Sequence, residues 1–347
     1  NINSWCNIDF SSSASNPICY ADSFYIDNVL ITEVFFDSNI TKIKSYSFSV
    51  YEKLVAVSIP ATVTSIEEDA FNGCKLVISY VESASRPSGW NYSWSDSTLV
   101  YWGVAQSNII VIDGVEYILA NGEITLTRIV DKTLTSVIVP NTITVNDTEY
   151  NVTKIGAYAF EGSNITSIVI PDGVISIGNY TFNNCVALET VTLGENSLLR
   201  TIGSYTFSGC TNLKSFTITD ELISVGTYAF NNCTSLETLI MSDAGKFQTV
   251  SNYAFYGCSS LESVILPSGV TAIGNHAFAG CTSLTEVYIP NTVTGMHNDI
   301  FEGCTSLTKI TIPYLNSNIG YLFGTSSYSS QEDYMPSSLK TVIVTGG

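Results

Sequence analysis

The sequence predicts an α/β solenoid that is mostly β, a right-handed stack of coils about 23 residues long. Three observations lead to this prediction: a phenylalanine that recurs at a nearly constant interval, apolar residues that alternate after it, and a glycine or asparagine at a fixed position between them. The chain has 347 residues, of which 45% are hydrophobic and 13% are charged. This length exceeds that of the usual single-core domain, so an elongated repeat stack is the expected architecture.

The recurring phenylalanine defines the repeat. Successive copies lie 22 to 25 residues apart, except for one long interval between Phe71 and Phe160. The position five residues earlier is apolar in all nine copies, from Ile43 to Met296. Because one coil cannot bury its apolar side alone, columns of this kind face an interior that stacking closes. The phenylalanines are Phe48, Phe71, Phe160, Phe182, Phe207, Phe230, Phe255, Phe278 and Phe301.

Two further columns follow the phenylalanine. A cysteine stands three residues after it in seven coils, and a leucine stands six residues after it in seven coils. The residue just before the cysteine is glycine or asparagine, which tolerate the left-handed backbone at the end of a helical turn. We therefore expect one short helical or 3₁₀ turn per coil, as in the stretch around Phe278.

The segment that starts at the leucine predicts a strand. It reads L-x-x-[VI]-x-[IL], as in Leu261, Val264 and Leu266, and its last positions alternate between interior and solvent. Proline follows in several coils and ends the strand, because it cannot donate to a ladder. These prolines are Pro60, Pro171, Pro267, Pro290 and Pro313.

The array is interrupted between about residues 80 and 151, where the phenylalanine and cysteine columns are missing. Asp113-Gly114, Asn121-Gly122 and Asn146-Asp147 are hairpin signals there. We therefore predict three parts: a first short array with a tryptophan-rich end (1–103), a β-hairpin-rich junction (104–133) and a longer array (134–347). Near the end, Leu339, Val342 and Val344 restore the strand pattern.

The segment Gly269–Pro290, GVTAIGNHAFAGCTSLTEVYIP, closely resembles the repeat of BspA-like leucine-rich-repeat proteins. The resemblance covers about residues 30 to 80 and 134 to 313. It implies a leucine-rich-repeat solenoid and an association with bacterial or protist cell surfaces, adhesion and binding to host matrix proteins or other cells. Fold alone does not determine function, so the ligand stays open.

The charge balance excludes several partners. The formal net charge of −18 would repel nucleic acid and anionic lipid.

No apolar stretch is long enough to cross a bilayer, and the chain begins at Asn1 rather than with a methionine or a signal peptide. We expect an extracellular or cell-surface location, no direct membrane insertion, and a chain that is part of a longer surface protein.

The sequence offers no catalytic residues, no metal ligands and no cofactor site. There is no C-x-x-C pair, and His276 and His297 occupy different repeat positions. The repeated cysteines are therefore interpreted as a buried thiol ladder that packs as small apolar groups. Cys6 and Cys19 lie outside the repeats, and whether they form a disulfide is left open. We expect a protein that is not an enzyme.

Two surfaces are candidates for binding an extracellular protein or glycan. The first is the outward face of the strands, which serves a binding scaffold, although a ladder of β-formers with no ligand has the same pattern. The second is an aromatic patch suited to stacking on sugars, Trp90, Trp94, Tyr101 and Trp102, although these residues also fit a cover for the end of the first array. A passive stalk is the remaining alternative. The outward residues are Thr190, Thr192, Ser215, Thr217, Thr238, Ile240, Ser263, Ile265, Glu286, Tyr288, Lys309 and Thr311.

Overall fold

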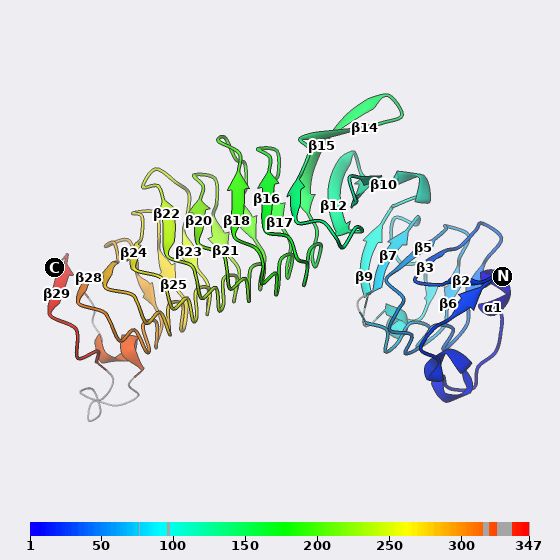
Figure 1. The fold of residues 1–347 in the computed structure, drawn as a ribbon, viewed down its shortest axis with the longest axis horizontal. Helices are drawn as coiled ribbons and strands as arrows, with labels where there is room; N and C mark the ends of the chain where they lie inside the picture. The colour runs from blue at the N-terminus through cyan, green and yellow to red at the C-terminus, as the bar shows by residue number, and fades with distance from the viewer. Residues whose placement is uncertain (76, 96–97, 315–318, 325–334, 347) are drawn as a thin grey trace. The chain divides into compact units, whose positions relative to one another are not determined.

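A computed structural model describes residues 1–347 except 76, 96–97, 315–318, 325–334 and 347. The chain forms two compact units, one made of Asn1–Ile110 with Ile118–Gly122 and the other of Val111–Tyr117 with Glu123–Gly347. Both units contain coils with about 23-residue spacing, about 12 coils in the described part of the chain (Figure 1). The fold is a mostly β solenoid with almost no helix, as predicted. The three-part division of the chain stays a prediction.

Each coil of the second unit contributes one longer strand to a parallel ladder. These strands pair in three successive groups, β13-β16-β18, β20-β22 and β24-β26-β28-β29. They are β13 (Ser136–Ile138), β16 (Ser167–Ile170), β18 (Thr190–Leu193), β20 (Ser215–Ile218), β22 (Thr238–Met241), β24 (Ser263–Ile265), β26 (Glu286–Tyr288), β28 (Lys309–Pro313) and β29 (Thr341–Thr345). Proline follows β16, β24 and β26 within two residues, whereas Pro313 is itself the last residue of β28.

A second ladder is built from the short extended pieces around the isoleucine column. Strand β15 (Thr148–Ile155) pairs with β12 (Glu123–Ile129) and begins a parallel series of two-residue strands. In each strand the second residue is the apolar one, so Ile155, Ile177 and Ile202 lie in register. The two-residue strands are β17 (Ser176–Ile177), β19 (Thr201–Ile202), β21 (Ser224–Val225), β23 (Thr249–Val250), β25 (Ala272–Ile273) and β27 (Gly295–Met296).

The core of the second unit is a column of stacked phenylalanine rings. Phe230 lies between Phe207 and Phe255, with ring centroids 5.0 and 5.1 Å away. All three rings are fully buried. Stacked rings this close fill the interior of every coil in the same way, which is why the phenylalanine interval is conserved along the chain.

The turn between the short strand and the cysteine differs from the prediction. The glycine or asparagine before the cysteine has positive φ as expected, for example 76° at Gly209 and 57° at Asn184. However, no helix or 3₁₀ element forms in these repeats; the chain makes consecutive turns instead. The reason is that the phenylalanine amide bonds to the next coil: Phe230 N donates to Ala254 O at 2.7 Å. An amide used across coils cannot close a helical turn.

The three dipeptides predicted to form hairpins all form two-residue turns with positive φ at both positions. Strands β14 (Thr142–Val145) and β15 form an antiparallel hairpin around Asn146 and Asp147, whose φ values are 48° and 61°. Strands β10 (Ile109–Ile112), β11 (Val115–Ala120) and β12 follow one another through Asp113-Gly114 and Asn121-Gly122, which also have positive φ. This backbone geometry is typical of type I′ turns.

The first unit has the same two ladders. The longer strands are β3 (Glu33–Phe35), β5 (Ala56–Ile59), β7 (Val77–Val81) and β9 (Thr98–Trp102), and the short ones are β4 (Lys42–Ile43), β6 (Ser65–Ile66) and β8 (Gly89–Trp90). The N-terminal segment contains α1 (Ile2–Trp5), η1 (Ser13–Ser15), η2 (Pro17–Tyr20) and the hairpin of β1 (Tyr25–Ile26) with β2 (Val29–Leu30). Cys6 and Cys19 are both free thiols. Elements η3 (Tyr92–Ser95) and η4 (Gln106–Asn108) complete the unit.

The last coil continues both the ladder of longer strands and the phenylalanine column. Strand β29 pairs with β28, so Leu339 to Val344 restore the strand as predicted. Element η5 (Ile319–Phe323) places Phe323 beside Phe301 with centroids 6.2 Å apart, and Leu322 O accepts a hydrogen bond from Phe301 N. The sequence did not lead us to expect this extra phenylalanine. Most of the segment between Pro313 and Leu339 lies outside the described residues.

Candidate binding surfaces

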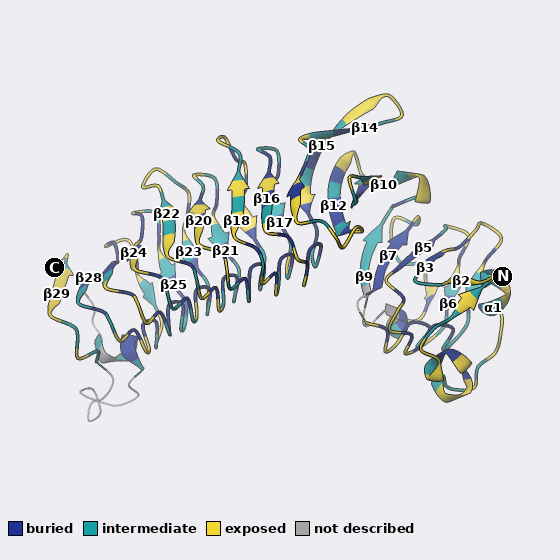
Figure 2. Ribbon diagram, viewed as in Figure 1, coloured by how far each residue is buried: buried dark blue, intermediate teal, exposed yellow. Residues whose placement is uncertain are grey.

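The outward residues of the longer strands in the second unit form two columns, which together are named the strand face here. Along β18 and β20, exposed residues alternate with less exposed ones, so Thr190 and Thr192 lie on one side and Val191 on the other (Figure 2). The parallel register aligns residues of the same column in neighbouring coils. For example, Ile265 is opposite Tyr288 in the ladder.

One column of the strand face is rich in hydroxyl groups and the other has an apolar stripe. In the second column, Ile240 and Ile265 are 53% and 62% exposed, and Tyr288 is 40% exposed. In the two coils before these, the same column has Thr192 and Thr217, so the exposed large apolar side chains gather in three consecutive coils. The apolar stripe, defined as Ile240, Ile265 and Tyr288, is the most distinctive feature of the strand face.

The structure places eleven of the twelve predicted outward residues at exposed or half-buried positions, with Thr311 as the exception. Thr311 is 7% exposed and counts as buried. It lies between Tyr288 and Ile343 in the ladder, and both of these side chains are larger than threonine. The alternation along one strand correctly gives the side on which Thr311 points, but it does not give the size of the residues on adjacent strands.

The strand face also extends beyond the residues we predicted. Ile138 on β13 pairs with Val169 on β16, which pairs with Thr192, so the second column begins two coils earlier. Ile138 and Val169 are both exposed. At the other end, Ile343 on β29 continues the column and is exposed as well. The same strand pattern that located Thr192 would have located all three residues.

The only charged pair on the strand face joins two adjacent coils among the described residues. Lys309 Nζ lies 2.6 Å from a carboxylate oxygen of Glu286, and the two residues are in register on β28 and β26. Both side chains are more than 40% exposed. A pair this accessible to water contributes at most about 1 kcal/mol to stability. The rest of the face is uncharged.

A groove of about 700 Å³ lies where strands β18, β20 and β22 end. It is formed by the ends of these strands and the loop residues that follow them, including Glu195, Asp220 and Glu221. Lys246 Nζ donates to Glu221 at 2.7 Å and holds the pKa of that carboxyl below its usual range. No side-chain partner of Glu195 or Asp220 occurs among the described residues. The groove is therefore acidic and open at the border of the strand face.

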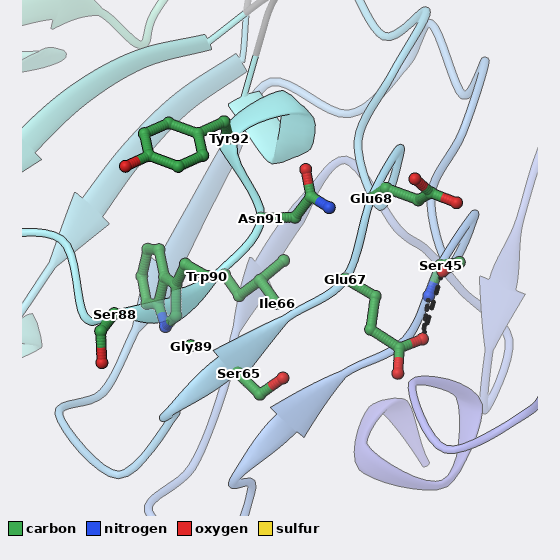
Figure 3. Close-up of a pocket in the computed structure, with 10 residues that line it drawn as sticks. All are labelled: Ser45, Ser65, Ile66, Glu67, Glu68, Ser88, Gly89, Trp90, Asn91 and Tyr92. Atoms are coloured by element: carbon green, nitrogen blue, oxygen red, sulfur yellow. Dashed lines mark hydrogen bonds between the residues drawn. The ribbon is translucent and has the colours of Figure 1, made fainter.

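A second hollow of about 500 Å³ lies beside the short strands of the first unit (Figure 3). Ser45, Glu67 and Asn91 contribute polar groups, while Trp90 and Tyr92 contribute aromatic rings. Ser45 donates to Glu67 through its amide at 2.9 Å, and Lys42 forms an ion pair with the same carboxylate. Burial by itself raises the pKa of the Glu67 carboxyl. The interactions with Lys42 and Ser45 outweigh this effect and leave the pKa below its usual range.

The predicted aromatic patch does not form an exposed platform. Trp90 and Trp94 are 3% and 1% exposed, and they pack edge to face with centroids 4.8 Å apart. Trp90 pairs in register with Ile66, and Trp94 packs against Phe71, so the tryptophans occupy core columns of the first array. Tyr101 and Trp102 are half-buried. The sugar-stacking interpretation of Trp90 and Trp94 was wrong, because their ring faces are buried in the core.

The repeat geometry agrees with a comparison to known families. The model of the BspA type leucine rich repeat region matches six copies in this chain, at residues 2–95, 153–249 and 248–342. The chain belongs to this family. No curated protein matches it at a significant level.

Solved structures that resemble the chain include bacterial leucine-rich repeat proteins. A T. pallidum leucine rich repeat protein is 24% identical over 58% of this chain and 80% of its own, with a TM-score of 0.43. A leucine-rich repeat protein from Bacteroides capillosus is 33% identical over 39% of this chain and 99% of its own, with a TM-score of 0.36. The pneumococcal vaccine antigen PcpA is 16% identical over 70% of this chain and 99% of its own, with a TM-score of 0.42.

The cysteine column of these BspA-type repeats has a specific partner. In each case the thiol donates to the carbonyl of the phenylalanine in the preceding coil, as Cys258 does to Phe230 O at 3.2 Å and Cys233 to Phe207 O at 3.1 Å. Burial raises the pKa of the Cys258 thiol to about 12. A thiol held neutral and hydrogen-bonded is a poor nucleophile and a poor metal ligand. The ladder therefore ties coils together rather than carrying chemistry.

The described residues contain no cluster of three or more histidine, cysteine, aspartate or glutamate side chains placed to hold a metal ion. His276 lies near two carboxylates, with its Nε2 3.2 Å from Glu302 and 3.6 Å from Asp299. His297 is exposed, lies two residues before Asp299 in the chain, and forms no ion pair among the described residues. Within the same residues, no helix has the length and apolar character needed to cross a bilayer.

Proposed function

We propose that this chain is a non-catalytic binding scaffold at the cell surface or in the extracellular space, and that the strand face binds a protein of another cell or of the host matrix. The observation that carries this proposal is the apolar stripe of Ile240, Ile265 and Tyr288, which are exposed at the same position of three consecutive coils, with Ile265 and Tyr288 paired in register. Solenoids with extended, regular faces are commonly used for binding. The membership of the BspA-type family supports a repeat scaffold of this kind.

The test is binding of the purified chain to immobilised matrix proteins and glycans. We expect the wild-type chain to bind at least one of the immobilised proteins. The double variant Ile265→Ser, Tyr288→Ser should lose most of that binding. The matched control is Val186→Ser, Tyr256→Ser, which removes one aliphatic and one aromatic exposed side chain from turns of the same unit. Equal binding by the two double variants would show that the strand face is not the site.

A carbohydrate-binding module is the second candidate, and it now depends on the hollow in the first unit. Tyr92 is 83% exposed, and the Arg86 guanidinium lies 3.6 Å above its ring. Asn91 and Ser88 line the same hollow and contribute polar groups to it (Figure 3). An aromatic ring with polar neighbours suits a sugar. Glycan binding that Tyr92→Ala removes would favour this candidate, and failure to bind either class of ligand would favour a passive stalk.

A further inference from the structure

Acidic residues form two borders of the strand face, one at each end of its strands. Before the strands, Glu189, Glu237 and Glu262 are exposed at corresponding positions of three coils. After the strands, the groove adds Glu195 and Asp220, which are also exposed. Between β18 and β22 the strand face therefore has exposed carboxylates at both ends of its strands, and Ile240 of the apolar stripe lines the groove there.

The basic residues near these borders do not neutralise them. Lys246 and Arg200 both face the single carboxylate of Glu221, at 2.7 and 4.0 Å. In the part of the chain that the structure describes, Glu195 and Asp220 have no cation within ion-pairing distance. Lys214 and Lys340 are the two basic residues in the described part of the column that contains Glu189 and Glu237. The borders therefore keep a net negative charge that a partner would meet on approach.

A negative electrostatic field that nearby cations do not neutralise favours a positively charged partner. Fields of like-signed groups beside a binding surface attract oppositely charged molecules and disfavour molecules of the same sign. The whole chain has a net charge of −18, so the borders act in the same direction as the rest of the molecule. A partner with lysine or arginine beside apolar residues fits both the borders and the stripe.

We infer that the strand face binds a cationic polypeptide segment, with its apolar side chains on the stripe of Ile240, Ile265 and Tyr288 and its basic side chains over Glu195, Asp220 and the opposite acidic border. The inference rests on the proposed function and adds the chemical class of the partner. The apolar contacts supply most of the affinity, because they are removed from water on binding. The charges supply selectivity and speed of association.

The experiment measures binding of three fluorescent synthetic peptides to the full chain: one alternating lysine with valine and tyrosine, one with glutamate in place of lysine, and one of lysine and serine only. We expect tight binding of the first peptide alone, with an affinity that falls as salt rises. Equal binding of the glutamate peptide would overturn the cationic preference. Equal binding of the lysine-serine peptide would overturn the role of the apolar stripe.

Two charge variants test the borders directly. Glu195→Gln, Asp220→Asn should weaken binding of the lysine-containing apolar peptide by about three- to tenfold, the range expected for two exposed charges. The control Glu161→Gln, Glu302→Gln changes the net charge by the same amount at turn positions away from the strand face. Equal effects of the two variants would overturn the inference.

The failure of this inference can be told from the failure of the proposed function. A matrix protein whose binding needs Ile265 and Tyr288, but is insensitive to salt and to Glu195→Gln, Asp220→Asn, would leave the strand face as the binding site and overturn only its cationic preference. Peptide binding that is salt-sensitive but unchanged in Ile265→Ser, Tyr288→Ser would place the peptide elsewhere and overturn the inference.

Discussion

The ring of Tyr253 stacks on the imidazole of His276, with 4.7 Å between the ring centroids and 6° between the planes. This contact is the end of a ladder of half-buried rings two residues before the phenylalanine column. Neighbouring rings in the ladder are 4.5 to 4.9 Å apart. The members are Tyr158, Tyr180, Tyr205, Tyr228, Tyr253 and His276.

All six ladder residues have the left-handed backbone conformation, with φ between 53° and 60°. Their amides explain how this is maintained: Tyr205 N donates to Thr227 O of the next coil at 3.0 Å, and Tyr228 N donates to Asn252 O at 3.2 Å. A side chain in this region costs about 1–2 kcal/mol per residue relative to the ordinary helical region. Ring stacking and the bond between coils offset that cost.

The first prediction concerns this strain. Tyr205→Gly should be more stable than Tyr205→Ala by about 1 kcal/mol, because both variants lose the ring but only glycine adopts φ of 57° without penalty. Urea unfolding followed by circular dichroism measures the difference. Thr217 on β20 is the control, since alanine should be more stable than glycine in a strand there. The same order of alanine and glycine at both sites would contradict the strain argument.

The second prediction concerns the phenylalanine column. Phe230→Ala should lower the free energy of unfolding by about 3–5 kcal/mol, through lost burial and a cavity between Phe207 and Phe255. Ile240→Ala, at an exposed strand-face position, should cost less than about 1 kcal/mol. Urea unfolding of both variants is the measurement. A loss at Phe230 no larger than that at Ile240 would mean that the register is wrong.

The third prediction concerns pH. The pKa of Cys258 is raised to about 12, whereas an unfolded cysteine titrates near 8.5. The folded state therefore holds its proton more tightly, so the contribution of this thiol is complete below about pH 8.5 and declines as the pH rises toward 12. At pH 10 the loss should be on the order of 1–2 kcal/mol for one such thiol.

Cys258→Ser provides the comparison for this pH effect. Serine has a hydroxyl that can still donate toward Phe230 O, but it does not ionise in this range. The difference in stability between pH 7 and pH 10, measured by urea unfolding under reducing conditions, should be smaller in Cys258→Ser than in wild type. Burial also raises the pKa of Cys19, which lies outside the column and is only half-buried, so Cys19→Ser should reduce the alkaline loss less than Cys258→Ser does. An unchanged alkaline loss in Cys258→Ser would refute the prediction.

The fourth prediction concerns the close approach of successive coils. A Cβ added at Gly226 would lie 2.5 Å from the backbone of Gly203 and of Ser204. Gly226→Ala should therefore cost about 1–3 kcal/mol, because backbone atoms cannot move aside as a flexible side chain would. Ser251 occupies the same repeat position in the next coil and already has a Cβ, so Ser251→Ala should be nearly neutral. Thermal unfolding of the two variants checks the contrast.

The candidate site was less predictable from the sequence than the core. The pattern around Thr190 and Ile265 correctly gave outward positions, because alternation along a strand is a local property. The acidic groove was not predicted, since Glu195 and Asp220 come from loops of different coils and are brought together only by stacking. The sequence analysis did not identify the tyrosine ladder, and neither its positive φ nor its stacking was anticipated.

The sequence by itself determined the repeat: the interval of Phe230, Cys233 and Leu236 requires the same interior in every coil, because each coil must bury the same side against its neighbours. The tertiary structure alone decided which outward residues reach solvent. Thr311 is buried between the larger residues Tyr288 and Ile343, and Trp90 fills a core position instead of a surface platform. The physical reason is that burial depends on the size of side chains in adjacent coils, which lie more than twenty residues away along the chain.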